Sequence, residues 1–422
     1  MKLSDQKIWE LSTSYKTPLY IYDGDFLENH VNRIRQYLHP SIDIFFSLKA
    51  NNNLFLAHCF LKKGFGAEVA SKGELFLAKT AGFLPSNIIF SGPGKNVDEI
   101  TYALEQNIYC VIIESYQELV IIEQLAQKMG MIANIAVRIN PDSDLVQSSI
   151  KMAGVPRQFG IDESQLVDVF EKINSSSFLH FRGIHIYTGT QILQAQQLYQ
   201  AFSYAVNLAR CIRDEYGLLC EMIDMGGGMG VPYFAHEKEL DFLTLAKRVN
   251  QLINKAVYDF PTTRFIIESG RYLTAETGVY VARVLYVKHS KGETFYIVDG
   301  GMHHHVSSTF RGRTLRNNFP IKLISKSMED CVPTPIQKAT IVGPLCTPED
   351  CLAKNVELPV AKEGDLIMIK KSGAYGLSYS PQLFLGHESA MEVYYYQGES
   401  RVIRERGRVE DLLLHQVLTK LK

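Results

Sequence analysis

A lysine stands where a buried strand is expected to end, in the run Phe46-Ser47-Leu48-Lys49-Ala50-Asn51. An amine held half out of water at such a place has a lowered pKa and can act as a nucleophile. Lysines of this kind form Schiff bases with carbonyl compounds, of which pyridoxal phosphate (PLP) is one. The alternative is a lysine whose methylene chain lies along the strand end while its amine reaches solvent. Residues at later strand ends must decide between the two.

Three consecutive glycines, Gly226-Gly227-Gly228, follow a later apolar run. Without Cβ atoms in the way, their backbone N–H groups can face an anion such as a phosphate. Thr190 and Arg271 could add a hydroxyl contact and a charge-assisted contact to the same phosphate. A tight strand-to-helix turn would explain the glycines equally well.

A carboxylate, Glu268, ends the apolar run Phe265-Ile266-Ile267 and is followed by Ser269-Gly270-Arg271. Burying a carboxylate there is costly unless it has a partner. Beside the ring nitrogen of PLP it would keep that nitrogen protonated and so strengthen the electron sink. An ion pair with Arg271 is the other explanation.

The C-terminal part of the chain adds three further candidates. Cys346 follows the turn Gly343-Pro344, where a thiol can be exposed and act as an acid, although inert packing is the commoner role. Tyr375 could donate to a phosphate or pack in the core. His303-His304-His305 could suggest a metal, but side chains of neighbouring residues rarely reach one ion, so we expect no metal site.

Short apolar runs recur along the first two thirds of the chain, separated by amphipathic stretches of helical length. They end at Lys49, Ser71, Gly94, Ser115, Asn140, Gly189, Gly228 and Gly270. Two of the helical stretches open with capping boxes, Ser71-x-x-Glu74 and Ser115-x-x-Glu118. Eight strand–helix units predict a closed (β/α)8 barrel, an α/β fold whose active site lies at the carboxyl ends of the strands. A doubly wound sheet is the alternative.

Two segments outside this repeat carry further expectations. The polar stretch of residues 148–160 is predicted to be a loop over the barrel mouth, or a lid. After about residue 275 the helical pattern stops, and β-rich runs separated by turns predict a mainly β domain. These runs are residues 279–288, 294–299, 339–342, 366–369 and 392–396, with a short amphipathic helix predicted over 409–421.

Bulk composition excludes several classes of protein. The 422 residues are too many for one ordinary core, so two domains are expected. With 44 basic and 45 acidic residues there is no charge excess that would favour nucleic acid or an acidic membrane surface. No apolar run approaches the ~18 residues that a membrane span needs. Seven cysteines without a CxxC pair indicate reduced thiols and a cytoplasmic protein.

Five segments, in order and at barrel-strand spacing, resemble the PLP-dependent decarboxylases of the alanine racemase fold, which include diaminopimelate, ornithine and arginine decarboxylases. They are Phe46–Asn51, Gly226–Gly228, Glu268–Arg271, Gly343–Cys346 and Gly373–Tyr375, within a resemblance that covers residues 18–395. The resemblance implies PLP fold type III, with a PLP-binding barrel of residues 24–275 and a β domain of residues 1–23 and 276–422. It also implies a homodimer with shared active sites.

By position, the resemblance assigns roles to residues of this sequence. Lys49 would bind PLP covalently and Glu268 would pair with its ring nitrogen. The phosphate would be surrounded by Gly226, Gly227, Gly228, Thr190, Gly270, Arg271 and Tyr375. Cys346, from the other subunit, would protonate the substrate carbon after CO2 leaves, and Arg271, Arg311, Thr347 and Tyr375 would face the substrate.

This sequence departs from the family pattern at the ring and at the substrate. Tyr187 stands where the family has a histidine stacked on PLP, and the sequence leaves open whether His185 or Tyr187 faces the ring; we predict Tyr187. The family's Cys-Glu pair, whose glutamate holds the distal end of the substrate, is Cys346-Thr347 here. Its Arg-Pro-x-Leu-Tyr segment is replaced by residues 308–313. The grip on a free distal group is therefore expected to be largely missing.

These departures resemble one branch of the family, which decarboxylates a glutamyl unit carried on an acyl carrier protein in the biosynthesis of the antibiotic butirosin. A tethered substrate has no free distal carboxylate, so the missing grip is expected. Arg311, Arg313 and Arg316 would suit an acidic carrier, although a solvated basic loop explains them as well. The alternatives are a diaminopimelate decarboxylase and a non-catalytic PLP-binding partner protein. A racemase is also conceivable, but Cys346 fits a decarboxylase better.

Overall fold

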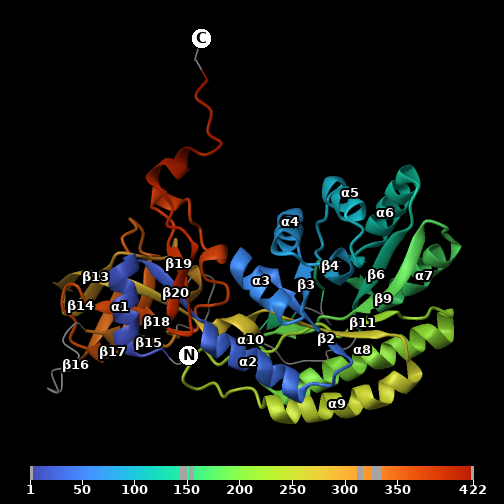
Figure 1. Cartoon of the computed structure of the whole chain (residues 1–422), viewed down its shortest axis with the longest axis horizontal. Helices are drawn as coiled ribbons and strands as arrows, with labels where there is room; N and C mark the ends of the chain where they lie inside the picture. Colours follow the sequence, from blue (N-terminus) through green and yellow to red (C-terminus); the bar gives the residue numbers. More distant parts are fainter. Residues whose placement is uncertain (1–2, 143–149, 152–155, 311–316, 326–334, 420–422) are drawn as a thin grey trace. The chain divides into compact units, whose positions relative to one another are not determined.

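The chain divides into two compact units in a computed structural model (Figure 1), which describes residues 3–142, 150–151, 156–310, 317–325 and 335–419. One unit contains residues 30–232 and 237–273, and it is called the barrel unit below. The other contains residues 1–29, 233–236 and 274–422, and it is called the β unit. No helix in the described part of the chain is long and apolar enough to cross a membrane.

Eight parallel strands close the sheet of the barrel unit. They are β2 (Ile42–Ser47), β3 (Gly66–Val69), β4 (Ile88–Phe90), β5 (Cys110–Ile113), β6 (Ala133–Asn140), β9 (Leu179–His185), β11 (Met222–Asp224) and β12 (Arg264–Ser269). Each pairs with the next in this order, and β12 returns to pair with β2. The predicted (β/α)8 barrel is therefore confirmed, and the doubly wound sheet is excluded because such a sheet stays open.

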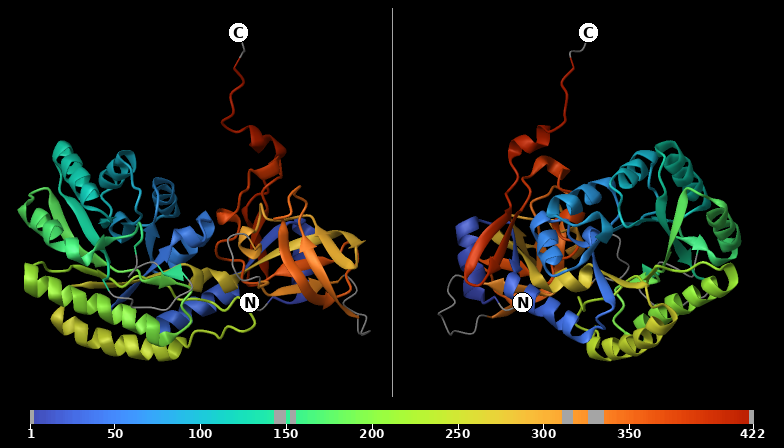
Figure 2. Two further views of the ribbon diagram at one scale, coloured as in Figure 1. Left: turned by 180° about the vertical axis from the view of Figure 1, so that it is seen from behind. Right: turned by 45° about the vertical axis from the view of Figure 1, so that its right-hand side comes forward.

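A helix follows each strand on the outside of the barrel. These helices are α3 (Leu54–Lys62), α4 (Lys72–Ala81), α5 (Val97–Glu105), α6 (Tyr116–Met129), α7 (Leu166–Ser175), α8 (Ala195–Tyr216), α9 (Phe242–Asp259) and the short α10 (Arg271–Thr274). The two longest, α8 and α9, lie side by side (Figure 2). Apolar strand residues such as Phe45, Ile112 and Ile266 fill the barrel interior. Their burial stabilises the closed sheet by roughly 2 kcal/mol per large side chain.

The predicted serine caps begin α4 and α6. The Ser71 and Ser115 hydroxyls accept the N–H groups of Glu74 and Glu118 at 3.1 and 3.2 Å. In a capping box the glutamate side chain would accept the N–H of the serine itself. Here Glu74 and Glu118 accept the N–H of the residue before the serine, Ala70 in the first case and Glu114 in the second. The helix starts are therefore tied to the strand ends just before them, which stiffens the edge of the barrel where the candidate residues lie.

Residues 148–149 and 152–155 of the predicted lid, residues 148–160, lie outside the described residues. Within it, β7 (Ile150–Lys151) pairs with β10 (Gly189–Thr190), which follows β9. Residues 156–160 lead into β8 (Ile161–Asp162), which pairs with the end of β6. This segment is thus tied to the carboxyl ends of two barrel strands, and its role as a lid stays a prediction.

The β unit is a branched nine-stranded sheet with helix α1 (Asp5–Tyr15). Its strands are β1 (Leu19–Asp23), β13 (Gly278–Ser290), β14 (Glu293–Val298), β15 (Ile321–Ile324), β16 (Ile336–Val342), β17 (Cys351–Pro359), β18 (Leu366–Ile369), β19 (Met391–Tyr396) and β20 (Glu399–Arg404). The order is β17-β16-β14-β13-β1-β19-β20, and β18 branches from β13 and carries β15. The five predicted β-rich runs are confirmed as β13, β14, β16, β18 and β19.

The predicted helix over residues 409–421 is wrong. The chain forms a single short 3₁₀ helix, Val409–Leu413, and then runs without regular structure to residue 419. Its apolar side chains, including Leu413 at 65% and Val417 at 82%, are exposed. An amphipathic pattern alone does not hold so short a helix together in water, because most helical stability comes from burying the apolar face.

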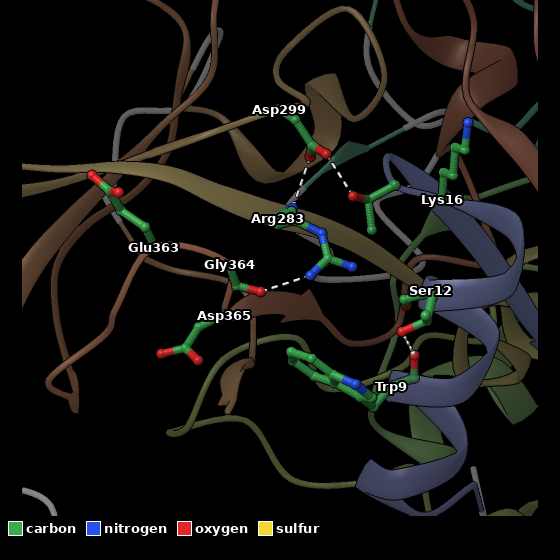
Figure 3. Close-up of a pocket in the computed structure, with 10 residues that line it drawn as sticks. Trp9, Ser12, Lys16, Arg283, Asp299, Glu363, Gly364 and Asp365 are labelled. Carbon is green, nitrogen blue, oxygen red and sulfur yellow. Dashed lines mark hydrogen bonds between the residues drawn. The ribbon is translucent and has the colours of Figure 1, made fainter. Parts of the chain in front are cut away.

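A cavity of about 660 Å³ lies in the β unit between α1 and the strands β13 and β14 (Figure 3). Two of its charged residues are paired with neighbours: Arg283 Nη1 donates to the Gly364 carbonyl at 2.7 Å, and Asp299 accepts the Thr17 hydroxyl and the Arg283 N–H. None of the residues predicted to do chemistry lines this cavity.

Candidate active site

Lys49 lies in the single 3₁₀ turn that follows β2, where the next chain segment leaves the barrel mouth. Its amine forms an ion pair with Glu68 at the end of β3, at 2.9 Å. The Ser91 hydroxyl donates to the same carboxylate oxygen at 2.5 Å. The Lys49 side chain is 38% exposed and that of Glu68 is fully buried. The amine is therefore half withdrawn from water and fixed in direction by a buried carboxylate.

Tyr187 lies beside this amine, two residues beyond the end of β9. The Lys49 Nζ atom is 5.7 Å from the centre of the Tyr187 ring, and the Arg138 guanidinium is 5.8 Å from it. Arg138, at the end of β6, is held by two hydrogen bonds to Glu114, of 3.0 and 3.1 Å. An aromatic ring at the barrel mouth thus has two cations near its face or edge.

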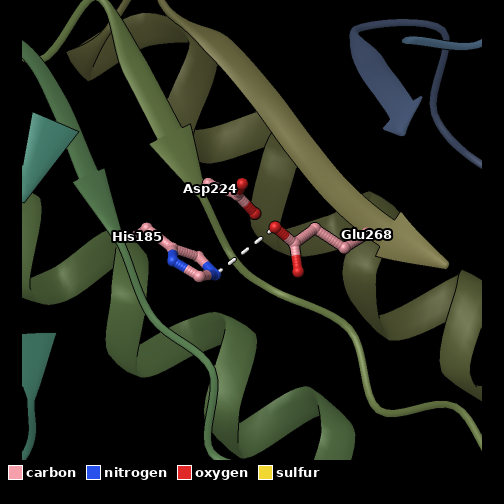
Figure 4. Close-up of side chains that lie close together, drawn as sticks. All are labelled: His185, Asp224 and Glu268. Atoms are coloured by element: carbon pink, nitrogen blue, oxygen red, sulfur yellow. Dashed lines mark ion pairs between the residues drawn. The ribbon is translucent and has the colours of Figure 1, made fainter. Parts of the chain in front are cut away.

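Three acid–base side chains from neighbouring strands meet just below, as Figure 4 shows. They are His185 at the end of β9, Asp224 at the end of β11 and Glu268 in β12. One ligand-type atom of each lies within 4.8 Å of the others, and all three residues are buried. His185 Nε2 is 3.5 Å from Glu268 Oε1, which is an ion-pair contact rather than a well-formed hydrogen bond.

The two carboxyl groups differ in charge. Burial would raise the pKa of Glu268, but the facing His185, Lys49 and Arg138 lower it to about 2. Burial and the neighbouring Glu268 instead raise the pKa of Asp224 well above its usual range. Of these two carboxyl groups, Glu268 therefore favours its ionised form and Asp224 favours its neutral form.

The turn Gly226–Gly228 requires glycine because backbone atoms surround it. A Cβ atom at Gly226 would lie 2.2 Å from the Ile186 carbonyl oxygen, and one at Gly227 would lie 2.0 Å from that of Glu268. Gly226 and Gly228 also have positive φ angles of 67° and 95°. The turn is thus packed against the ends of β9 and β12, next to the three acid–base groups.

Gly270 and Thr190 border the same region from other strand ends. A Cβ atom at Gly270 would lie 2.6 Å from that of Ala50, so this glycine allows the end of β12 to approach the turn that carries Lys49. Thr190 is in β10, directly after Gly189, whose carbonyl oxygen faces Gly228. The predicted residues of the barrel unit therefore gather at the carboxyl ends of its strands.

The predicted residues of the β unit lie on two turns. Cys346 is exposed, in a loop that Asp350 holds by accepting the Met302 and Leu345 N–H groups at 2.6 and 2.8 Å. Thr347 lies in the same loop, and its hydroxyl accepts the Glu349 N–H at 3.3 Å. Tyr375 has a positive φ of 52°, and its ring meets Tyr379 edge-on. Arg311, Arg313 and Arg316 lie outside the described residues.

The histidine triplet is buried, and its members make separate contacts. The His304 ring bonds the Glu388 carbonyl at 2.8 Å, and His305 Nδ1 accepts the Ser308 N–H at 3.1 Å. The His303 ring packs against His304 and His387, and burial lowers its pKa to about 3. The triplet is therefore packed, and burial disfavours a charge on His303 and His304.

Three acidic residues at the site were not predicted from the sequence: Glu68, Glu114 and Asp224. Asp224 ends β11, Glu114 directly follows β5, and Glu68 is the last residue but one of β3, so each lies near the end of a short, largely apolar strand. A carboxylate inside a fully buried strand is itself a signal, since it must have a partner.

A lysine, a carboxylate and a glycine turn at the carboxyl ends of barrel strands define a barrel enzyme whose site can hold an anionic cofactor. The family described as "Pyridoxal-dependent decarboxylase, pyridoxal binding domain" matches residues 25–275 of this chain. The chain belongs to this family, and the protein is a PLP-dependent carboxy-lyase.

Relatives of known activity match nearly the whole chain. It is 50% identical over 421 residues to the L-glutamyl-[BtrI acyl-carrier protein] decarboxylase of Niallia circulans, covering 100% of this chain and 98% of that one. It is 33% identical over 405 residues to the diaminopimelate decarboxylase of Helicobacter pylori strain J99, covering 96% of each. The crystal structure of the H. pylori diaminopimelate decarboxylase complexed with L-lysine superposes with a TM-score of 0.86 at 31% identity, covering 96% of this chain and 98% of that one.

Proposed function

We propose that this protein removes the α-carboxylate of an L-glutamyl unit carried on an acyl carrier protein, so that CO2 leaves and a γ-aminobutyryl unit stays on the carrier. The observation that carries this proposal is the 50% identity to the L-glutamyl-[BtrI acyl-carrier protein] decarboxylase over the full length of the chain. The pair Cys346-Thr347 supports it, since the glutamate that would hold a free distal group is missing.

The residues at the barrel mouth fit PLP. Buried polar atoms without a hydrogen bond among the described residues, Glu268 Oε1 and both ring nitrogens of His185, indicate a place for a polar ligand. The glycine turn offers N–H groups for a phosphate, and the Lys49 amine stands at the mouth. When bound, PLP supplies the electron sink that makes loss of CO2 from an amino acid possible.

The remaining chemistry is assigned to this chain's own side chains. Lys49 would hold the cofactor covalently, and Glu68 keeps the Lys49 amine in place. Glu268, ionised, keeps the ring nitrogen of the cofactor protonated. Tyr187 would stack on the ring, because it lies beside the Lys49 amine, whereas His185 faces Glu268. Gly226, Gly227, Gly228, Thr190, Gly270 and Arg271 surround the phosphate.

Residues of the β unit have proposed roles as well. Tyr375 would donate to the phosphate, and Cys346, from the second subunit of a homodimer, would supply a proton to the substrate carbon that has lost its carboxylate. Thr347, Arg271 and Arg311 face the substrate or its carrier. We further propose that the enzyme acts in the cytoplasm, in a biosynthetic pathway for an antibiotic.

The test is a substrate comparison with the purified, PLP-loaded enzyme. L-glutamyl carrier protein, free L-glutamate and meso-diaminopimelate are incubated separately, and mass spectrometry detects the loss of one CO2. We expect loss from the carrier-bound substrate alone. Loss from diaminopimelate alone would instead assign the activity of the H. pylori relatives. No loss from any substrate by a protein that binds PLP would favour a non-catalytic partner protein.

A further inference from the structure

Asp224 occupies a central place at the barrel mouth that the proposed chemistry does not use. It ends β11, where it pairs with His185 of β9 and lies opposite Ile266 of β12. It is fully buried. The strand carrying it therefore lies between the two strands that carry the His185–Glu268 pair.

The two oxygens of Asp224 have different surroundings. Oδ1 accepts the N–H of Gly226, the first glycine of the turn, at 2.9 Å. Oδ2 has no hydrogen-bond partner among the described residues, and neither has Glu268 Oε1. Figure 4 shows these two carboxyl groups turned toward each other. Two bare carboxylate oxygens facing each other in a dry site repel and are costly, but one shared proton satisfies both.

The charges around Asp224 decide which group holds that proton. Asp224 faces Glu268 and His185 on the two flanking strands. The other titratable groups near Asp224 or Glu268 are Lys49, in the turn after β2, and Glu68, Arg138 and Cys110 on other barrel strands. The facing side chains of His185, Lys49 and Arg138 favour the ionised form of Glu268, whereas burial and the charge of Glu268 favour the neutral form of Asp224.

We propose that Asp224 is a positioning residue that donates a hydrogen bond from Oδ2 to the Glu268 carboxylate. The proposal rests on the proposed function in one respect, namely that Glu268 is the group that meets the cofactor's ring nitrogen. Asp224 then fixes one Glu268 oxygen from behind and leaves the other for the cofactor.

The same residue links the two ends of the cofactor site. The Glu268 N–H donates to the Gly226 carbonyl at 2.8 Å, while the Gly226 N–H donates to Asp224. Asp224, Gly226 and Glu268 therefore form a closed set of hydrogen bonds between the glycine turn and the ring-nitrogen carboxylate. Losing the side chain would loosen both the phosphate end and the nitrogen end of the site.

The test uses Asp224→Asn and Asp224→Ala. In Asp224→Asn the amide oxygen keeps the Gly226 bond, and the NH2 group donates to Glu268 as the neutral carboxyl group would. We expect Asp224→Asn to restore most of the PLP affinity that Asp224→Ala loses, and we expect that loss to be about tenfold or more, the size of one buried hydrogen bond. Equally weak binding by both variants would overturn the proposal.

The apoprotein gives a second readout that a merely structural role would not move. A neutral carboxyl group in the fold becomes ionised on unfolding, so the wild type loses stability as pH rises above the usual aspartate pKa. The melting temperature of Asp224→Asn should therefore gain on that of the wild type between pH 5 and pH 8. Asp241→Asn, at the exposed cap of α9, is the matched control and should show no such gain, because the Asp241 carboxyl has a lowered pKa.

A second variant keeps the proposal testable if Asp224→Asn fails to fold. In Glu268→Gln the side-chain amide can donate to Oδ2, so Asp224 no longer needs its proton and the same gain with pH is expected. A protonated Asp224 would be contradicted if the melting temperature of either variant, relative to that of the wild type, stayed constant or fell as pH rises. It would also be contradicted by a stoichiometric divalent cation in the purified apoprotein. None of these outcomes depends on which substrate is decarboxylated, so failure of the substrate assignment is seen separately.

Discussion

Replacing Glu268 with glutamine removes the negative charge that His185, Lys49 and Arg138 favour. Burial raises the pKa of this carboxyl group, but His185, Lys49 and Arg138 lower it more, to about 2 from 4.5, so the net preference for the ionised form is about 3 kcal/mol. Glutamine keeps the shape but not the charge. If the ring nitrogen of the cofactor loses stabilisation of the same size, kcat falls by about two orders of magnitude. KM should change little, because Glu268 is not proposed to touch the substrate.

The assay is CO2 release by Glu268→Gln at saturating carrier-bound substrate, with cofactor content measured by absorbance in the same sample. Glu221→Gln is the matched control, because Glu221 directly precedes β11 at the opposite mouth of the barrel. Its partners are His180 and Arg182 at the surface, so we expect wild-type kcat. A fully loaded Glu268→Gln enzyme with kcat within about threefold of wild type would refute the electrostatic reasoning.

Three further predictions concern the glycine turn, the ring and the histidine cluster. Gly227→Ala would place a Cβ atom 2.0 Å from a backbone oxygen, so we expect a stability loss of about 2 kcal/mol or more and weak PLP binding in calorimetry, whereas Gly94→Ala, with open space around it, should be neutral. Tyr187→Ala should weaken PLP binding and slow turnover while Tyr187→Phe keeps both; normal behaviour of Tyr187→Ala would remove the stacking role. His303 has a pKa of about 3 in the fold and 6.5 when unfolded, so the unfolding free energy should fall below pH 6.5 by at most about 1.4 kcal/mol per pH unit. His303→Gln should reduce that slope in urea titrations at pH 5 and 6.5, and an unchanged slope would show that His303 is charged in the fold.

The barrel could be predicted because its signals are local and repeated. Eight apolar runs of strand length alternate with helical stretches, and Ser71 and Ser115 cap helices as their side chains require. The helix predicted over residues 409–421 does not form, and the apolar side chains of this segment are exposed in the described part of the chain. An amphipathic pattern predicts a helix only when its apolar face packs against another part of the protein, and the sequence does not show whether such a packing surface exists.

Site residues that belong to a local sequence motif could be predicted, whereas contacts between residues on different strands could not. Lys49, Glu268 and the glycine turn stand in recognisable runs at strand ends. The pairing of Lys49 with Glu68, 19 residues later, depends on strands β2 and β3 lying side by side in a given register. The meeting of His185, Asp224 and Glu268 likewise depends on strand order in the closed barrel.

The proposed function depends on the Lys49 amine, which would carry the cofactor at the mouth of the barrel. Reduction of the PLP-loaded enzyme with borohydride, followed by peptide mapping, tests this most directly. We predict a single pyridoxyl label, on the peptide that contains Lys49, and its disappearance in Lys49→Ala. A label on another lysine, or none in an enzyme that still decarboxylates its substrate, would contradict the assignment of the site.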